Sequence, residues 1–291
     1  MSPEVPASAE SRVMRVGSPR SPGLSTGTVV LLAIVLVGGR VVLDLTLGPD
    51  GAEPWQRLVE VLTAVMTIAV ALHFSPGDPP RRPWSVLAIA MAVLPAVRLL
   101  SYFQIKAGDI AAAHVLLILG NFAMAYAVFG FGRVLGSSEL LSDRTAEDRV
   151  RATTFVSLLA VGALAMLAFP TLELALRGMP ATAGAWIAAS TTIVSTLCDA
   201  LVFAGGTYLV WLVRPLLGGS LARPYLLIAV GGGAFLVVDM LLVTAGATTQ
   251  TELLGSDMRN LLTRWLGCLA FTGFALAAAT QFALLRSARR R

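Results

Sequence analysis

Apolar runs of about 20 or more residues recur along the whole chain, with short polar stretches between them. Each run can cross a hydrocarbon core of about 30 Å as an α-helix. The pattern predicts eight spans. These spans cover residues 25–47, 55–74, 84–105, 109–135, 152–176, 183–213, 223–246 and 260–286. The predicted fold class is therefore an all-α, polytopic integral membrane helical bundle.

The ends of the chain differ in composition from the rest. Residues 1–24 are rich in Pro, Ser and Arg, and we expect a disordered cytoplasmic tail there. Residues 25–286 form a single transmembrane helical domain, and 287–291 form a basic cytoplasmic tail. The first apolar run is too long for the core of a cleavable signal peptide, so we interpret it as a signal anchor.

Composition supports the membrane assignment. Hydrophobic residues make up 56% of the chain and charged residues only 13%, which lies outside the range of soluble globular proteins. The net charge of +5 does not indicate a nucleic-acid partner, because the basic residues lie at the ends of apolar runs instead of along one stripe. We expect the lipid bilayer as the surrounding partner and no nucleic acid.

The basic residues also predict the orientation. When loops are assigned alternately to two sides, 15 Arg residues fall on one side, and Arg57, Lys106, Arg177 and Arg259 fall on the other. The side with more Lys and Arg faces the cytoplasm. Eight spans with both termini in the cytoplasm fit this count. The fifteen are Arg12, Arg15, Arg20, Arg81, Arg82, Arg133, Arg144, Arg149, Arg151, Arg214, Arg223, Arg286, Arg289, Arg290 and Arg291.

Ionisable residues inside the spans are the candidate functional groups, because each costs on the order of 2.5–3.5 kcal/mol to insert and needs a partner or water. Counted from the inner arginines, Asp199, Asp239 and Arg98 lie about 22–24 Å up their helices. Glu173, Arg264 and His114 lie near the outer interface. The polar groups are thus concentrated in the outer third, which predicts an outward-facing polar vestibule.

The run 183–213 carries a polar stripe. At 100° per residue, Thr192, Ser195, Thr196 and Asp199 fall on one helix face. Such a stripe can bind a cation, relay protons or hydrogen-bond a ligand, and it can equally serve close helix–helix contact. The full set of candidate ligand-binding residues is Asp199, Asp239, Arg98, Arg264, Glu173, His114, Asn121, Thr192, Ser195 and Thr196.

Two kinds of ion pair are expected. We predict that Asp199 or Asp239 lies within reach of Arg98 or Arg264, since the acids and arginines occupy similar depths. Arg40 and Asp44 are four residues apart, which predicts a local pair on one helix.

Several chemistries find no support in the sequence. His73 and His114 fall at opposite membrane faces, and no cluster has metal-ligand spacing, so we expect neither a metal nor a cofactor. No hydrolase, phosphate-loop or paired-carboxylate motif is present, and we assign no catalytic residue. Cys198 and Cys268 lie in apolar runs and predict no disulfide framework.

The pattern as a whole favours a non-enzymatic membrane module that binds a small molecule or lipid and acts as a sensor or accessory subunit, with a membrane or cytoplasmic protein as partner. One alternative is a secondary transporter that uses Asp199 and the Thr192/Ser195/Thr196 stripe. The other is an intramembrane lipid-modifying enzyme with Asp199, Asp239 or His114 as acid or base. Many spans with short loops broadly resemble the sensor regions of bacterial signalling proteins, so we expect a multi-pass protein of the bacterial plasma membrane.

Overall fold

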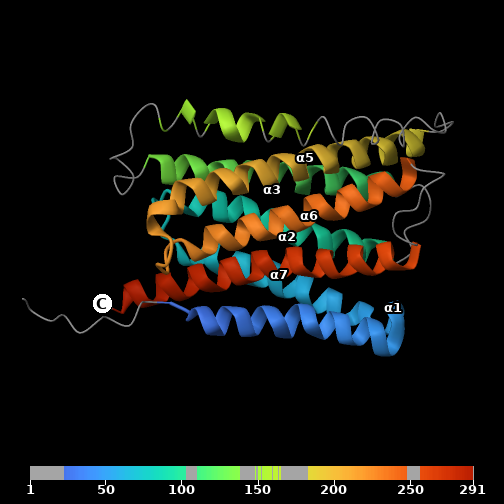
Figure 1. Ribbon diagram of the computed structural model, residues 1–291, viewed down its shortest axis with the longest axis horizontal. Coiled ribbons are helices and arrows are strands. Elements are labelled where there is room, and N and C mark those ends of the chain that lie inside the picture. The colour runs from blue at the N-terminus through green and yellow to red at the C-terminus, as the bar shows by residue number, and fades with distance from the viewer. Residues whose placement is uncertain are drawn as a thin grey trace, which may run out of the picture.

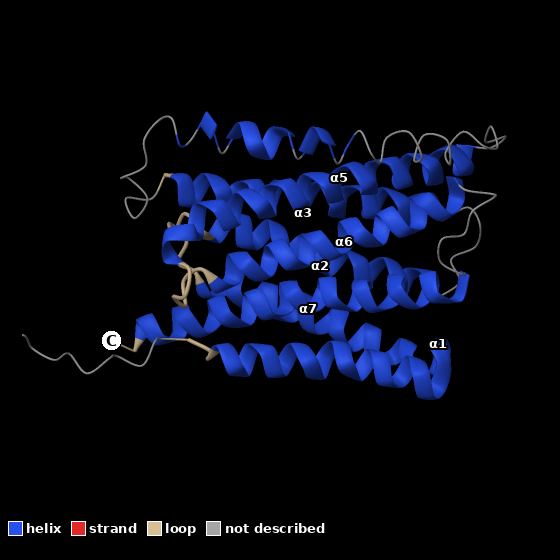
Figure 2. Ribbon diagram, viewed as in Figure 1, coloured by secondary structure: helices blue, strands red, loops and turns tan. Residues whose placement is uncertain are grey.

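The computed structural model describes residues 23–102, 110–137, 183–247 and 256–290, together with 148, 150, 151, 153–158, 160–162 and 164. Figure 2 shows that the regular elements of these residues are all helices, which confirms the all-α part of the predicted class. They are α1 (Thr26–His73), α2 (Arg81–Tyr102), α3 (Ile110–Gly136), α5 (Ala183–Val213), the 3-10 turn η2 (Arg214–Leu216), α6 (Arg223–Ala247) and α7 (Ser256–Arg289).

Five of the described helices are long and apolar enough to cross a membrane, namely α1, α3, α5, α6 and α7. Large apolar side chains such as Leu31, Val42 and Leu119 are exposed along them, as expected for helices that face lipid. The predicted span 152–176 lies mostly outside the described residues. Its described positions 153–158 and 160–162 are helical.

Helix α1 is a hairpin of two arms. Its 48 residues would extend about 72 Å if straight, more than twice the thickness of a membrane core. Gly48 breaks it with φ 74° and ψ −179°. The indole nitrogen of Trp55 on the second arm then donates a hydrogen bond to the carbonyl of Leu36 on the first, at 2.8 Å. Figure 1 shows the two arms running back along each other.

The predicted spans 25–47 and 55–74 are these two arms, but the loop predicted between them is wrong in extent. Only Gly48 departs from helical geometry, and the second arm begins directly after it at Pro49. Proline fits there because a first-turn residue has no helical partner for its N–H, and its fixed φ is already helical. The turn therefore needs one residue where the sequence predicted seven.

The helices close into a ring. Each described helix packs against its neighbours in chain order, α5 follows α3, and α7 packs back against α1. Helix α7 contributes most to the interior, because nearly every side chain from Cys268 to Ala278 is buried. Thr63 on the second arm of α1 reaches the backbone of this helix, with its hydroxyl 3.0 Å from the carbonyl of Phe271.

Small residues permit the closest helix contacts. A Cβ on Gly273 of α7 would lie 2.9 Å from the carbonyl oxygen of Leu227 and 3.0 Å from the Cα of Gly231, both on α6. A Cβ on Gly206 of α5 would lie 2.9 Å from the Cα of Ala229 on the other side of α6. Glycine at these positions therefore lets the backbones of α5, α6 and α7 approach as they do in membrane bundles.

The two ends of the bundle differ in charge. At one end, the carbonyl of Leu24 accepts a hydrogen bond from Arg223, and the carbonyl of His73 accepts one from Arg289. We call this the basic end. The chain entering α1 and the C-terminus of α7 both lie there, as Figure 1 shows. Its described arginines are Arg81, Arg82, Arg133, Arg214, Arg223, Arg286, Arg289 and Arg290. The opposite end, where α1 turns at Gly48, is called the hairpin end.

Trp84, near the start of α2, has a fully buried side chain. Its ring packs edge-on against Phe131 of α3, with centroids 5.1 Å apart. The connection between α1 and α2 is short, and Arg82, two residues before Trp84, takes the exposed position.

We expect the hairpin turn to depend on Gly48. Replacement by Ala places a Cβ in a backbone region that is essentially restricted to glycine, so Gly48→Ala should lower the free energy of unfolding by about 1–3 kcal/mol. The matched control is Gly38→Ala, because Gly38 lies in the first arm and a Cβ added there would have nothing within 4 Å. It should leave stability unchanged or slightly higher. Denaturant titration in detergent measures both, and equal stability of the two variants would contradict this account of the turn.

Candidate functional site

The site begins with an ion pair within the first arm of α1. Arg40 and Asp44 are one helical turn apart, and their side chains meet in two contacts. Arg40 Nε lies 2.9 Å from Asp44 Oδ2, and Nη2 lies 3.2 Å from Oδ1. Both residues are buried. The predicted local pair is confirmed, and its two-point geometry is the strong form of an arginine–carboxylate contact.

Arg40 also ties the hairpin together. Its Nη1 donates to the carbonyl of Ala52, at 2.6 Å, and lies 3.7 Å from a carboxylate oxygen of Glu53. Both partners are on the second arm. A local pair on the first arm thus becomes a tertiary contact once Gly48 reverses the chain.

Asp44 connects the hairpin to α7. The indole nitrogen of Trp265 donates to Asp44 Oδ2 at 3.1 Å, and Arg264 Nε lies 3.3 Å from Oδ1. One buried carboxylate therefore faces two guanidinium groups and an indole N–H. It neutralises positive charge contributed by two helices.

A second set of polar residues extends along the second arm. Glu53, Gln56, Arg57 and Glu60 are spaced so that they fall on one helix face. Arg57 lies 2.6 Å from Glu53 and 3.5 Å from Glu60, and Gln56 donates to Glu60 at 3.0 Å. Sequence reasoning placed Arg57 at the outer boundary and omitted this set from the site. The i, i+3, i+4, i+7 spacing of polar residues was the signal that could have found it.

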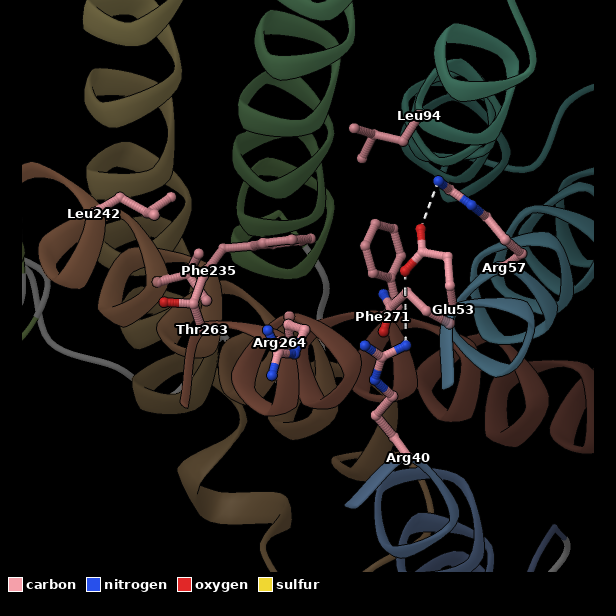
Figure 3. A pocket seen from close by; sticks show the side chains of 12 residues that line it. Arg40, Glu53, Arg57, Leu94, Phe235, Leu242, Thr263, Arg264 and Phe271 are labelled. Atoms are coloured by element: carbon pink, nitrogen blue, oxygen red, sulfur yellow. Dashed lines mark ion pairs between the residues drawn. The ribbon is translucent and has the colours of Figure 1, made fainter. Parts of the chain in front are cut away.

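Glu53, Gln56 and Arg57 line one wall of a cavity of about 420 Å³ at the hairpin end (Figure 3). The volume falls within the range typical of small-molecule sites. The polar lining is Arg40, Glu53, Gln56, Arg57, Thr263 and Arg264, and the remaining lining is Leu94, Phe235, Val238, Leu242, Gly267 and Phe271. Four helices, α1, α2, α6 and α7, therefore meet around it.

Several polar atoms at the cavity are buried without a hydrogen-bond partner. They are Oε1 of Gln56, Nη1 of Arg57 and Nε of Arg264. The two arginine nitrogens lie within ion-pair distance of carboxylates, but they donate no hydrogen bond to them. A buried polar group without a partner costs about 1–3 kcal/mol.

The predicted acids form a separate pair. Asp199 on α5 and Asp239 on α6 are in side-chain hydrogen-bond contact with each other, and Thr196 also bonds to Asp239. Two carboxyl groups can share a hydrogen bond only if one keeps its proton. Among the described side chains, Arg264 forms its ion pair with Asp44 and none with these acids. The predicted pairing of Asp199 or Asp239 with Arg264 is therefore not found, since Asp44 lies closer to that arginine.

The other predicted site residues lie apart or outside the described part of the chain. His114 and Asn121 are partly buried on α3, where Nδ1 of His114 is buried without a hydrogen-bond partner. Ser195 is partly buried beside Thr196 on α5. The side chains of Arg98 and Thr192 and the whole of Glu173 lie outside the described residues. In the part of the chain that is described, no group of three or more His, Cys, Asp or Glu residues could hold a metal ion.

Comparison of the chain with protein-family models, with curated proteins and with solved structures finds no match. The geometry of the cavity and of the acid pair is therefore the basis for the function.

We expect a strong energetic coupling between Arg40 and Asp44. Asp44→Leu alone leaves a buried arginine uncompensated and should cost about 3–5 kcal/mol, whereas Arg40→Met with Asp44→Leu should recover part of that loss. The matched control is the Glu53–Arg57 pair, whose side chains are 43% and 42% exposed. A cycle of Glu53→Gln and Arg57→Gln should show a coupling below about 1 kcal/mol. Unfolding free energies of the single and double variants measure both, and similar couplings in the two cycles would contradict the central role of the buried pair.

Proposed function

We propose that the protein crosses the membrane eight times, with the basic end in the cytoplasm and the hairpin end outside. The two arms of α1 and helices α2, α3, α5, α6 and α7 supply seven crossings, and the segment around 153–164 supplies the remaining one. An even number agrees with the two ends of the described chain lying together, where a Cβ on Gly23 would lie 3.3 Å from the side chain of Leu284. The excess of arginine at that end supports its cytoplasmic side.

We propose further that the protein is a ligand-binding membrane module, which acts as a sensor or accessory subunit and not as an enzyme. The observation that carries this is the 420 Å³ cavity, which joins three guanidinium groups to an apolar wall. Binding sites of this kind have a mostly apolar lining with a few polar groups that orient the ligand. In the proposed orientation the cavity lies in the outer part of the membrane.

The buried carboxylates of the site support binding over acid–base catalysis. Asp44 is held by Arg40, Arg264 and Trp265, and Glu60 is held by Gln56 and Arg57. Both carboxylates are fully buried against these partners and do not line the cavity. These acids balance the charge of the arginines, which leaves the arginines to recognise a ligand.

Cysteine accessibility tests both the orientation and the cavity. In a Cys198→Ala/Cys268→Ala background, Thr263→Cys should react with a membrane-impermeant thiol reagent added outside intact cells. Ser287→Cys, at the basic end, should react only after the cells are permeabilised. Adding Gly267→Leu should slow the reaction at position 263, because Gly267 lines the cavity and a Cβ added there would have nothing within 4 Å. Labelling of Ser287→Cys in intact cells would overturn the orientation, and no effect of Gly267→Leu would contradict an open cavity.

A second candidate, a proton-coupled transporter, is favoured by the pair of Asp199 and Asp239. A transporter of this kind would carry its proton on this pair, which lies between α5 and α6 in the part of the proposed membrane nearer the hairpin end. Toward the basic end, however, α5 presents Gly206 in backbone contact with Ala229, and a Cβ on Gly232 would lie 2.7 Å from the side chain of neighbouring Val202. These are close apolar contacts, so transport requires α5 and α6 to separate.

Reconstituted vesicles test this candidate. A transporter should show proton flux, followed by an internal pH-sensitive dye, and Asp199→Asn should abolish it because the amide cannot carry the proton. Thr191→Val on the same helix, whose side chain is buried, is the matched control and should leave any flux unchanged. We expect the wild-type protein to show no flux above empty vesicles, and a flux abolished only by Asp199→Asn would replace the ligand-binding proposal with transport.

A further inference from the structure

The chemistry of the cavity wall indicates what kind of ligand it takes, and this inference rests on the proposed binding function. Arg40, Arg57 and Arg264 line the cavity, while Glu53 is the acidic residue of the lining. The side chains of Asp44 and Glu60 are fully buried and do not line the cavity. The site as a whole is close to neutral, but the surface that a ligand meets carries more positive than negative charge. An anionic group is therefore favoured.

Three polar atoms of residues that line the cavity are buried without a hydrogen-bond partner. Arg57 Nη1 and Arg264 Nε are buried donors without a hydrogen-bond acceptor. Gln56, which is 7% exposed, donates its amide nitrogen to Glu60 and leaves Oε1 as an acceptor without a donor. Because the carboxylate of Glu60 requires the nitrogen side of this amide, the orientation of Gln56 is set. These three atoms have almost no accessible surface, so a ligand in the cavity meets the remaining, exposed parts of the Arg57 and Arg264 side chains, which favour an anionic oxygen.

The opposite wall is apolar and leads toward the lipid. Phe235, Val238 and Leu242 are spaced along one face of α6, and Leu242 is 48% exposed on the outside of the bundle. Figure 3 shows Leu242 and Phe235 on the side of the cavity away from Arg57. A hydrocarbon chain can therefore follow α6 from the cavity into the bilayer while the polar group stays among the arginines.

We infer that the cavity binds an amphipathic phosphate ester, such as the headgroup of an anionic phospholipid. The accessible N–H groups of Arg57 and Arg264 bind the phosphate oxygens, and the acyl chain lies along α6. Guanidinium groups suit this role because their planar donors match phosphate geometry.

Photocrosslinking in vesicles tests the ligand class. The full-length protein is reconstituted in phosphatidylcholine with a trace of either phosphatidylglycerol or phosphatidylcholine that carries a photoreactive group on an acyl chain. We expect the phosphatidylglycerol probe to label residues 235–242 about tenfold more than the phosphatidylcholine probe, as two charged hydrogen bonds predict at least that difference. Arg57→Gln and Arg264→Gln should each reduce this labelling to near the level of the neutral probe.

Control variants separate binding from folding. Arg259→Gln removes an arginine from the same end of α7 outside the cavity lining and should leave labelling unchanged. Arg264→Lys keeps the charge beside Asp44 and should retain more labelling than Arg264→Gln. Equal loss in Arg259→Gln and Arg264→Gln would overturn the specific role of Arg264, since any nearby charge would then serve.

The outcomes also distinguish this inference from the proposed function. Gly267→Leu should reduce the labelling of residues 235–242 that comes from the cavity, because its side chain occupies part of that space. Equal labelling by the two probes, both sensitive to Gly267→Leu, would overturn the anionic class and leave the binding function intact. Labelling that ignores Gly267→Leu would overturn both. Soluble glycerol 3-phosphate would displace the lipid probe at equal concentration only if the acyl chain added nothing to binding. That result would overturn the inference that the ligand is amphipathic.

Discussion

Asp44 is the charge on which the hairpin end of this bundle depends. Its buried carboxylate holds Arg40 on the same helix, and it also faces Arg264 and Trp265 across the interface with α7. In a poorly solvated interior, one unpaired charge would cost several kcal/mol, so each member of this cluster is retained only with its partners. The orientation of the α1 hairpin against α7 follows from this requirement, because Arg40 also bonds to the backbone of the second arm.

The cavity follows from the same arrangement. Three arginines gather around buried acids, and their guanidinium groups are wide and rigid, so not every N–H finds an acceptor. These arginines also line a space that α6 completes with apolar side chains. Charge balance thus stabilises this end of the fold and leaves a cavity with arginines on one side and apolar side chains on the other.

The acid pair on α5 and α6 is a second, separate group of buried polar side chains. Asp199 and Asp239 lie in side-chain contact with each other. The arginines gather between α1 and α7, and the two acids lie between α5 and α6. The small residues near that pair keep α5 and α6 in close contact.

The sequence by itself determined the all-helical class, the ends of most helices and the pair of Arg40 and Asp44. These features depend on local patterns, namely the length of apolar runs and the spacing of residues one helical turn apart. The break at Gly48 was predicted only as a longer loop, because a single residue with positive φ leaves little trace in hydropathy. Tertiary structure decided which acids meet which arginines. Depth along a helix brings Asp44, Asp199 and Asp239 equally near Arg264, but only the rotation of each helix about its axis selects the partner, and that rotation is set by packing between faces distant in sequence.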